Sequence, residues 1–107
     1  MPKRYSLSGP EIRSVKPSRR ISGMLFSLAI ARIPDRTVPG VAFVVSKKVA
    51  LRANVRNLIK RRLRSAVRTH VGKLLAGSAY IFTARRNASH ADYADIASDV
   101  QDLIAKI

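Results

Sequence analysis

The chain has 107 residues and a formal net charge of +15, and 47% of its residues are hydrophobic. The length predicts one domain over residues 1–107, and the apolar fraction excludes a disordered basic tail because it can supply a small core. The absence of cysteine excludes disulfides and thiolate metal sites, and no apolar run reaches the ~18 residues of a membrane span. We therefore expect a soluble, cytoplasmic protein without a secretory signal or a membrane partner.

The N-terminal third predicts a short helix followed by a strand. Residues 1–9 are basic and show no apolar periodicity, so we expect an irregular lead-in. A helix is expected over residues 10–15, because Pro10 suits the first turn of a helix. Residues 21–32 alternate apolar with small or polar side chains, which predicts one strand with Met24 on its apolar face.

The remainder of the chain predicts a strand, a long helix, a strand and a final helix. Residues 41–45 are apolar on both sides, which is typical of a central strand. Helices are expected over residues 51–71 and 93–107, and a further strand over residues 79–84. The apolar stripe of the long helix is formed by Val55, Ile59, Leu63, Ala66 and Val67. This order predicts an α/β protein of the α+β two-layer sandwich type, with helices packed on a small central sheet.

The charge is distributed unevenly along the sequence. Residues 1–91 carry a net charge of +18, whereas residues 92–107 carry −3. The acids of the C-terminal segment are Asp92, Asp95, Asp99 and Asp102. We interpret them as a solvated acidic helix face rather than a metal site, and we predict no catalytic or metal-ligating residue. A compact chain with so many like charges repels itself, which indicates a polyanionic partner such as nucleic acid.

The long helix carries the most informative pattern. Bases recur at every fourth position and would form one cationic ridge beside the apolar stripe: Arg52, Arg56, Lys60, Arg64 and Arg68. Arg61 and Arg62 widen this ridge, Asn57 adds an amide, and Lys47 and Lys48 extend it toward the preceding strand. Like charges at this spacing destabilise an isolated helix by ~0.2–0.5 kcal/mol per pair. The ridge therefore predicts a row of phosphates as its counter-charge, in RNA or DNA.

Two stretches of this region carry a family resemblance. They read Ser46-Lys47-Lys48-Val49 and Val55-Arg56-Asn57-Leu58-Ile59-Lys60-Arg61-Arg62-Leu63-Arg64. They closely resemble the strand end and the "RNR" helix of the bacterial ribonuclease P protein subunit. The stretch Tyr80-Ile81-Phe82-Thr83-Ala84-Arg85 and the amphipathic segment that follows it resemble the family's last strand and C-terminal helix. The resemblance thus covers nearly the whole chain in the right order.

The resemblance implies a fold with an uncommon left-handed βαβ crossover. It also implies a protein that binds the catalytic RNA of ribonuclease P and the 5′ leader of precursor tRNA. The RNA would perform the Mg²⁺-dependent cleavage and would bind the metal mainly by itself, and DNA is not expected as a partner. The residues expected to bind RNA are Lys47, Lys48, Arg52, Arg56, Asn57, Lys60, Arg61, Arg64 and Arg68.

The resemblance also implies a leader-binding cleft between helices and sheet, typically with aromatic residues on the first helix and the first long strand. In this chain the residues expected at the cleft are Ile12, Arg13, Lys16, Ala29 and Tyr80. The family's aromatic positions fall at Ile12, Lys16 and Ala29, and Leu58 replaces the second arginine of the RNR motif. Since base stacking supplies ~1–3 kcal/mol per base, we expect leader binding here to depend more on charge, from Arg13, Lys16, Arg19 and Arg20.

A ribosomal-type structural RNA-binding protein without a catalytic partner is the main alternative. It would explain the charge and the fold equally well, whereas a DNA-binding architectural protein fits less well. The order of strand, Ser-Lys-Lys, RNR-like helix, strand, Ala-Arg step and amphipathic helix favours the ribonuclease P family.

Overall fold

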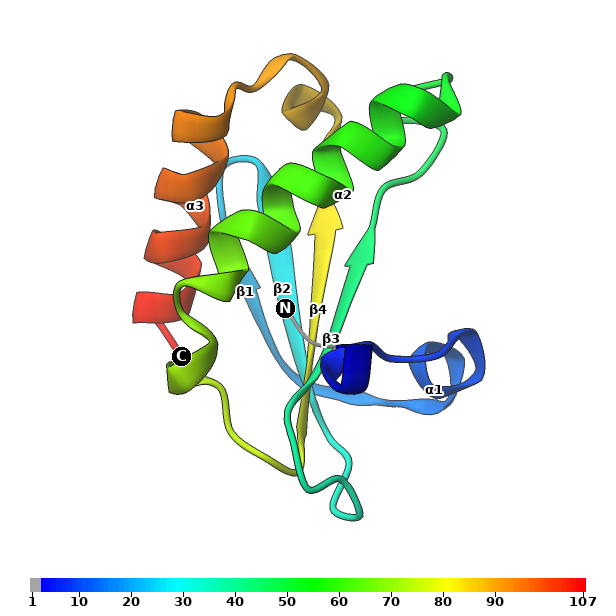
Figure 1. The fold of residues 1–107 in the computed structure, drawn as a ribbon, viewed down its shortest axis with the longest axis vertical. Coiled ribbons are helices and arrows are strands. Elements are labelled where there is room, and N and C mark those ends of the chain that lie inside the picture. The colour runs from blue at the N-terminus through cyan, green and yellow to red at the C-terminus, as the bar shows by residue number, and fades with distance from the viewer. Residues whose placement is uncertain (1–2) are drawn as a thin grey trace.

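The computed structural model describes residues 3–107, which form a four-stranded mixed sheet with α-helices packed against it (Figure 1). The strands are β1 (Pro17–Ser22), β2 (Phe26–Arg32), β3 (Gly40–Val44) and β4 (Ser78–Ala84). The helices are α1 (Gly9–Ser14), α2 (Ala53–Arg68) and α3 (Tyr93–Ala105), with 3₁₀ turns at Lys3–Tyr5, Val71–Lys73 and Arg86–His90. The strand order is β1-β2-β4-β3, with β3 parallel to β4 and the other neighbours antiparallel. The predicted α+β sandwich is confirmed.

Helix α2 connects the two parallel strands. In Figure 1 the arrows of β3 and β4 both point upward, α2 crosses in front of the sheet, and β4 lies to the left of β3. A path that moves leftward through a helix in front of the sheet is a left-handed crossover, whereas nearly all such connections are right-handed. The unusual hand implied by the family resemblance is therefore present.

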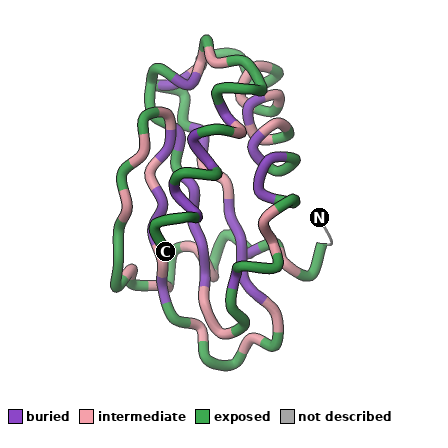
Figure 2. Tube along the Cα trace, turned by 90° about the vertical axis from the view of Figure 1, so that its left-hand side faces the viewer, coloured by how far each residue is buried: buried purple, intermediate pink, exposed green. Residues whose placement is uncertain are grey.

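The sheet has two different faces. The face toward α2 and α3 carries large buried side chains, among them Phe26, Leu28, Tyr80 and Phe82. The opposite face is formed mainly by alanines, namely Ala29, Ala31, Ala42 and Ala79, and is covered in part by Leu7 and Ile12. Figure 2 shows the buried residues gathered along the strands and on the inward sides of the helices. None of the helices within residues 3–107 is long and apolar enough to cross a membrane.

The strand predicted over residues 21–32 is confirmed only over Phe26–Arg32; its first residues belong instead to the end of β1 and to the turn of the β1–β2 hairpin. The turn is held by the carboxylate of Asp99 on α3, which accepts hydrogen bonds from the backbone N–H groups of Met24, Leu25 and Phe26 at 2.8, 3.1 and 2.9 Å. Met24 consequently lies in the turn with 81% of its surface exposed. Asp99 is only 6% exposed, so the prediction that it belongs to a solvated acidic face is also wrong.

Strand β3 is an edge strand, not the predicted central strand. Both of its sides are nevertheless apolar, because α2 packs on one side and the N-terminal segment on the other. The lead-in is accordingly more ordered than predicted over its described residues, 3–9. Ser6 forms an isolated bridge with Val41, and the N–H of Leu7 donates to the Val41 carbonyl at 3.0 Å. The buried Leu7 side chain thus covers one end of the sheet edge.

A capping box fixes the start of α1. The Ser8 hydroxyl accepts from the N–H of Glu11 at 3.2 Å, and the Glu11 carboxylate accepts from the N–H of Ser8 at 2.9 Å. A guanidinium nitrogen of Arg36 lies 3.0 Å from the same carboxylate. The hydrogen bond from the Ser8 backbone, with help from the Ser8 hydroxyl and Arg36, lowers the pKa of Glu11. The helix is thereby tied to the loop before β3.

Candidate nucleic-acid interface

Helix α2 separates an apolar side from a cationic side. Its buried residues are Ile59, Leu63, Ala66 and Val67, which face the sheet and α3 as the periodicity predicts. Its sixteen residues include six bases and no acid. The one ion pair among residues 3–107 joins Arg36 to Glu11, so the bases of α2 have no acidic partner in the described chain. This side of the helix therefore keeps its full positive charge available for an external anion.

The predicted RNA-binding residues lie on this helix and on the turn before it. The exposed members are Lys47, Lys48, Arg52, Asn57, Arg61, Arg64 and Arg68, and the half-buried members are Arg56 and Lys60. Lys47 and Lys48 lie in the turn after β3, and Arg52 is the N-cap residue of α2. A shallow hollow of about 560 Å³ on the outer side of α2 includes Leu58 beside Asn57 and Arg61. The departure from the RNR motif thus places an apolar side chain among the bases of this surface.

Two bases of α2 also make contacts within the protein. A terminal nitrogen of Arg56 donates to the carbonyls of Ala50 and Leu51 at 3.0 and 2.7 Å, and so holds the loop that leads into the helix. Arg62 is half-buried and donates to the Ala91 carbonyl at 3.4 Å, next to the start of α3. The Arg62 side chain is therefore directed toward the start of α3 and does not widen the cationic ridge as predicted. Arg56 holds the preceding loop, a structural role that the sequence pattern did not indicate.

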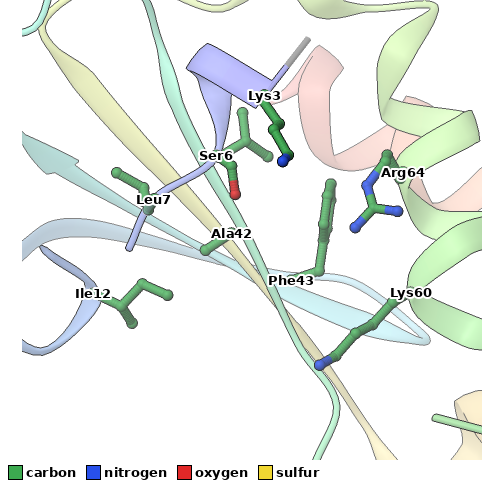
Figure 3. A pocket seen from close by; sticks show the side chains of 9 residues that line it. Lys3, Ser6, Leu7, Ile12, Ala42, Phe43, Lys60 and Arg64 are labelled. Carbon is green, nitrogen blue, oxygen red and sulfur yellow. The ribbon is translucent and has the colours of Figure 1, made fainter. Parts of the chain in front are cut away.

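A second, more enclosed cavity of about 490 Å³ opens between the N-terminal segment, β3 and α2 (Figure 3). Its apolar lining includes the side chains of Leu7, Ile12 and Phe43, and its charged lining consists of Lys3, Lys60 and Arg64. The guanidinium carbon of Arg64 lies 5.7 Å from the centre of the Phe43 ring, within the range of a cation–π contact. The cavity thus extends the cationic ridge around the edge of the sheet.

The residues predicted for the leader-binding cleft do not all come together. Ile12 packs against the cluster that contains Ala29, on the face of the sheet away from α2, and Arg13 and Lys16 are exposed. Tyr80 lies on the opposite face, 1% exposed, and its hydroxyl accepts from the N–H of Leu75 at 3.0 Å. The prediction that Tyr80 faces this cleft is wrong, because its side chain belongs to the core beneath α2.

The arginines expected to bind the leader by charge are also divided. Arg20 pairs across the sheet with Ala29, so its side chain lies on the same face as the predicted cleft. Arg19 lies on the other face, where it donates to the carbonyl of Lys106 at the C-terminal end of α3 at 2.6 Å. This contact suits the negative end of the α3 dipole, so Arg19 supports the fold on that face.

The sequence pattern did not indicate that Phe43 and Lys3 line a cavity beside Lys60 and Arg64 of α2. Phe43 lies within an uninterrupted apolar run, which is typical of core, and only the edge position of β3 leaves its ring half-buried. Lys3 lies in the segment expected to be irregular, and only the bridge between Ser6 and Val41 brings it beside Phe43. Neither placement has a local signal in the sequence.

Comparison with known proteins gives a consistent result. The family model described as "Ribonuclease P" matches residues 1–107. The chain is 34% identical over 79 residues to the ribonuclease P protein component of a Picosynechococcus species, covering 73% of this chain and 68% of that protein. It is 30% identical over 104 residues to the corresponding protein of a Cyanothece species, covering 97% of this chain and 79% of that protein.

Solved structures show the same fold at lower identity. The RNase P protein of Staphylococcus aureus superposes with a TM-score of 0.80 at 18% identity, covering 95% of this chain and 94% of that one. The RNase P protein of Thermotoga maritima superposes with a TM-score of 0.71 at 19% identity, covering 90% and 86% of the two chains.

Proposed function

The chain belongs to the ribonuclease P protein family, and from that premise we propose that its cationic ridge binds ribonuclease P RNA. The family makes the chain a protein component of a tRNA-processing ribonuclease and implies an RNA partner. The observation that carries the proposal is the row of bases along α2, which has no acidic partner among residues 3–107. Phosphates bound along this row would relieve the mutual repulsion of the bases and release counterions.

The shape of the row supports contact with a continuous RNA backbone. Lys47 and Lys48 precede α2 in an exposed turn, and Arg61 and Arg68 are exposed on the helix. Arginine forks can bond two phosphate oxygens at once, and the amide of Asn57 can donate to a phosphate or a base edge. We assign these residues the task of fixing the protein on the RNA.

We further propose that the protein assists removal of the 5′ leader of precursor tRNA in the cytoplasm, while the RNA performs the cleavage. A leader contact is supported by positively charged side chains near the sheet face that carries Ala29. Arg20 lies beside Ala29 on that face, and Arg13 and Lys16 are exposed. Mg²⁺ prefers oxygen ligands, whereas the interface consists of bases and an amide. No cluster of three acidic or histidine side chains within residues 3–107 could hold a metal ion. The interface residues therefore do not fit a magnesium site, and we assign the ion to the RNA.

Reconstitution tests this proposal. A bacterial ribonuclease P RNA is mixed with precursor tRNA at low Mg²⁺, with and without the protein, and release of the leader is followed over time. We expect the protein to accelerate release, because its bases offset the repulsion between the RNA backbones that Mg²⁺ otherwise screens. Tight binding of the RNA without acceleration would instead support the ribosomal-type structural role, and absence of both would contradict the proposal.

A further inference from the structure

The cavity at the edge of β3 combines an aromatic ring, that of Phe43, with positively charged side chains around it. Figure 3 shows the Phe43 ring between Lys3 and Ser6 on one side and Arg64 on the other, with the Lys60 side chain extending below it. The ring also packs on Phe82, with the two centres 5.9 Å apart, so it is supported from within the core. The site therefore offers a planar aromatic ring, on which a nucleobase can stack, and positively charged side chains around it, which can bind a phosphate. These features match the two parts of a nucleotide.

Phe43 is also the aromatic residue best placed to meet RNA. The chain has six Phe and Tyr residues, and three of them are buried in the core: Phe26, Tyr80 and Phe82. Tyr93 lies on α3 and bonds through its hydroxyl to Ser65 at 3.3 Å, and Tyr5 lies beneath the Arg4 guanidinium. Of the aromatic residues, only Phe43 lines the cavity that the cationic ridge borders.

The edge of the sheet is open at this point. Within the described chain, the N-terminal segment pairs with β3 only at Val41, so Phe43 lies just beyond the covered part of the strand. The cavity volume of about 490 Å³ is within the range of sites that hold small ligands. A base within a duplex is already stacked on its neighbours, so a lone ring in a cavity suits an unpaired nucleotide.

We propose that this cavity binds one unpaired nucleotide of RNA, with its base stacked on Phe43 and its phosphate beside Lys3, Lys60 and Arg64. The proposal rests on the proposed function, because it assumes that α2 faces RNA. Phe43 on β3 would thus supply the base stacking that Ile12 and Ala29, at the expected cleft positions, cannot supply because they are not aromatic. The nucleotide could belong to the leader of precursor tRNA or to the ribonuclease P RNA, since both offer unpaired bases and phosphates.

The test uses Phe43→Leu, which keeps an apolar side chain but removes the aromatic face. Two dissociation constants are measured, one of the protein for ribonuclease P RNA and one of the reconstituted holoenzyme for precursor tRNA, with mature tRNA as reference. We expect Phe43→Leu to weaken one of them by about 5- to 150-fold, the range that one base–aromatic stack supplies. Phe43→Trp should restore binding, and Tyr93→Leu, at an aromatic residue outside the cavity, should have no effect.

The constant that changes identifies the source of the nucleotide. A loss confined to precursor tRNA assigns it to the leader, and a loss of affinity for ribonuclease P RNA assigns it to that RNA. Single abasic substitutions are then stepped along the unpaired stretches of the identified RNA. We expect one position to weaken binding to the wild-type protein but not to Phe43→Leu, an interaction that misfolding of the variant could not produce.

Wild-type affinity in both assays for Phe43→Leu would overturn the proposal. So would abasic penalties that are the same in the wild-type protein and the variant. In either case, intact binding of ribonuclease P RNA and stimulated cleavage by the wild-type protein would leave the proposed function standing. Failure of the wild-type protein itself to bind RNA or stimulate cleavage would instead contradict the proposed function.

Discussion

At the scale of single residues, the Asp99 carboxylate organises a part of the fold far from it in sequence. It lies on α3 and accepts three backbone N–H groups from the turn between β1 and β2. The close approach also explains Gly23, where an added Cβ would lie 2.7 Å from a carboxylate oxygen of Asp99 and from the carbonyl oxygen of Phe26. One buried acid therefore joins the hairpin to the C-terminal helix.

We predict that Asp99→Ala lowers the free energy of unfolding by about 2–4 kcal/mol, because it leaves the buried N–H of Phe26 and the partly buried N–H groups of Met24 and Leu25 without their acceptor. Urea unfolding followed by circular dichroism measures the effect. Asp102→Ala is the matched control, since Asp102 is an exposed acid on the same helix and should change stability by less than about 0.5 kcal/mol. Equal midpoints for the two variants would contradict this role of Asp99.

At the scale of elements, the regular parts of the fold were predictable and the long-range contacts were not. The period of apolar residues identified α2 and the C-terminal helix, because each buries one side along its whole length. The β1–β2 turn was missed because its stabilising carboxylate lies more than seventy residues away. Strand β3 was placed at the centre because periodicity cannot distinguish a strand flanked by strands from an edge strand covered by Leu7 and α2.

In the candidate interface, too, the helical pattern was predictable and the contacts between elements were not. The four-residue spacing of bases on α2 was sufficient to predict a cationic surface, since a helix converts spacing directly into a face. The sequence did not reveal that Arg56 bonds the preceding loop or that Tyr80 faces the core. Each of these placements depends on which side of a strand or loop meets another element, and that is decided by the assembled fold.

Arg56 and Arg61 should therefore behave differently when replaced. We predict that Arg56→Ala lowers the free energy of unfolding by about 1–2 kcal/mol, through its two lost hydrogen bonds to the loop, and also weakens RNA binding. Arg61→Ala should weaken RNA binding with no change in stability, because Arg61 is exposed on the outer side of α2. Urea midpoints and titrations with ribonuclease P RNA check both. An Arg56→Ala variant that unfolds at the wild-type midpoint would show that its loop contacts contribute nothing.

At the scale of the whole molecule, the net charge of +15 is separated by the fold into two regions. The segment of residues 92–107, which includes α3, holds the net −3 and contacts α2, while residues 1–91 hold +18. The uncompensated bases of α2 thus lie on the outer surface, next to a cavity with an aromatic lining. The structure accordingly supports one continuous RNA-binding surface that extends from the turn after β3 along α2.

The most direct test of an RNA-binding surface on α2 is the salt dependence of binding to ribonuclease P RNA. The test variant removes three exposed positive charges of this surface: Lys48→Gln, Arg61→Gln and Arg68→Gln. The control variant removes three exposed positive charges elsewhere: Arg32→Gln, Lys73→Gln and Lys106→Gln. We predict that the first variant reduces the slope of log Kd against log salt concentration by about three, one for each lost phosphate contact. The second variant should keep the wild-type slope. Equal slopes for the two variants would contradict the assignment of the RNA-binding surface to α2.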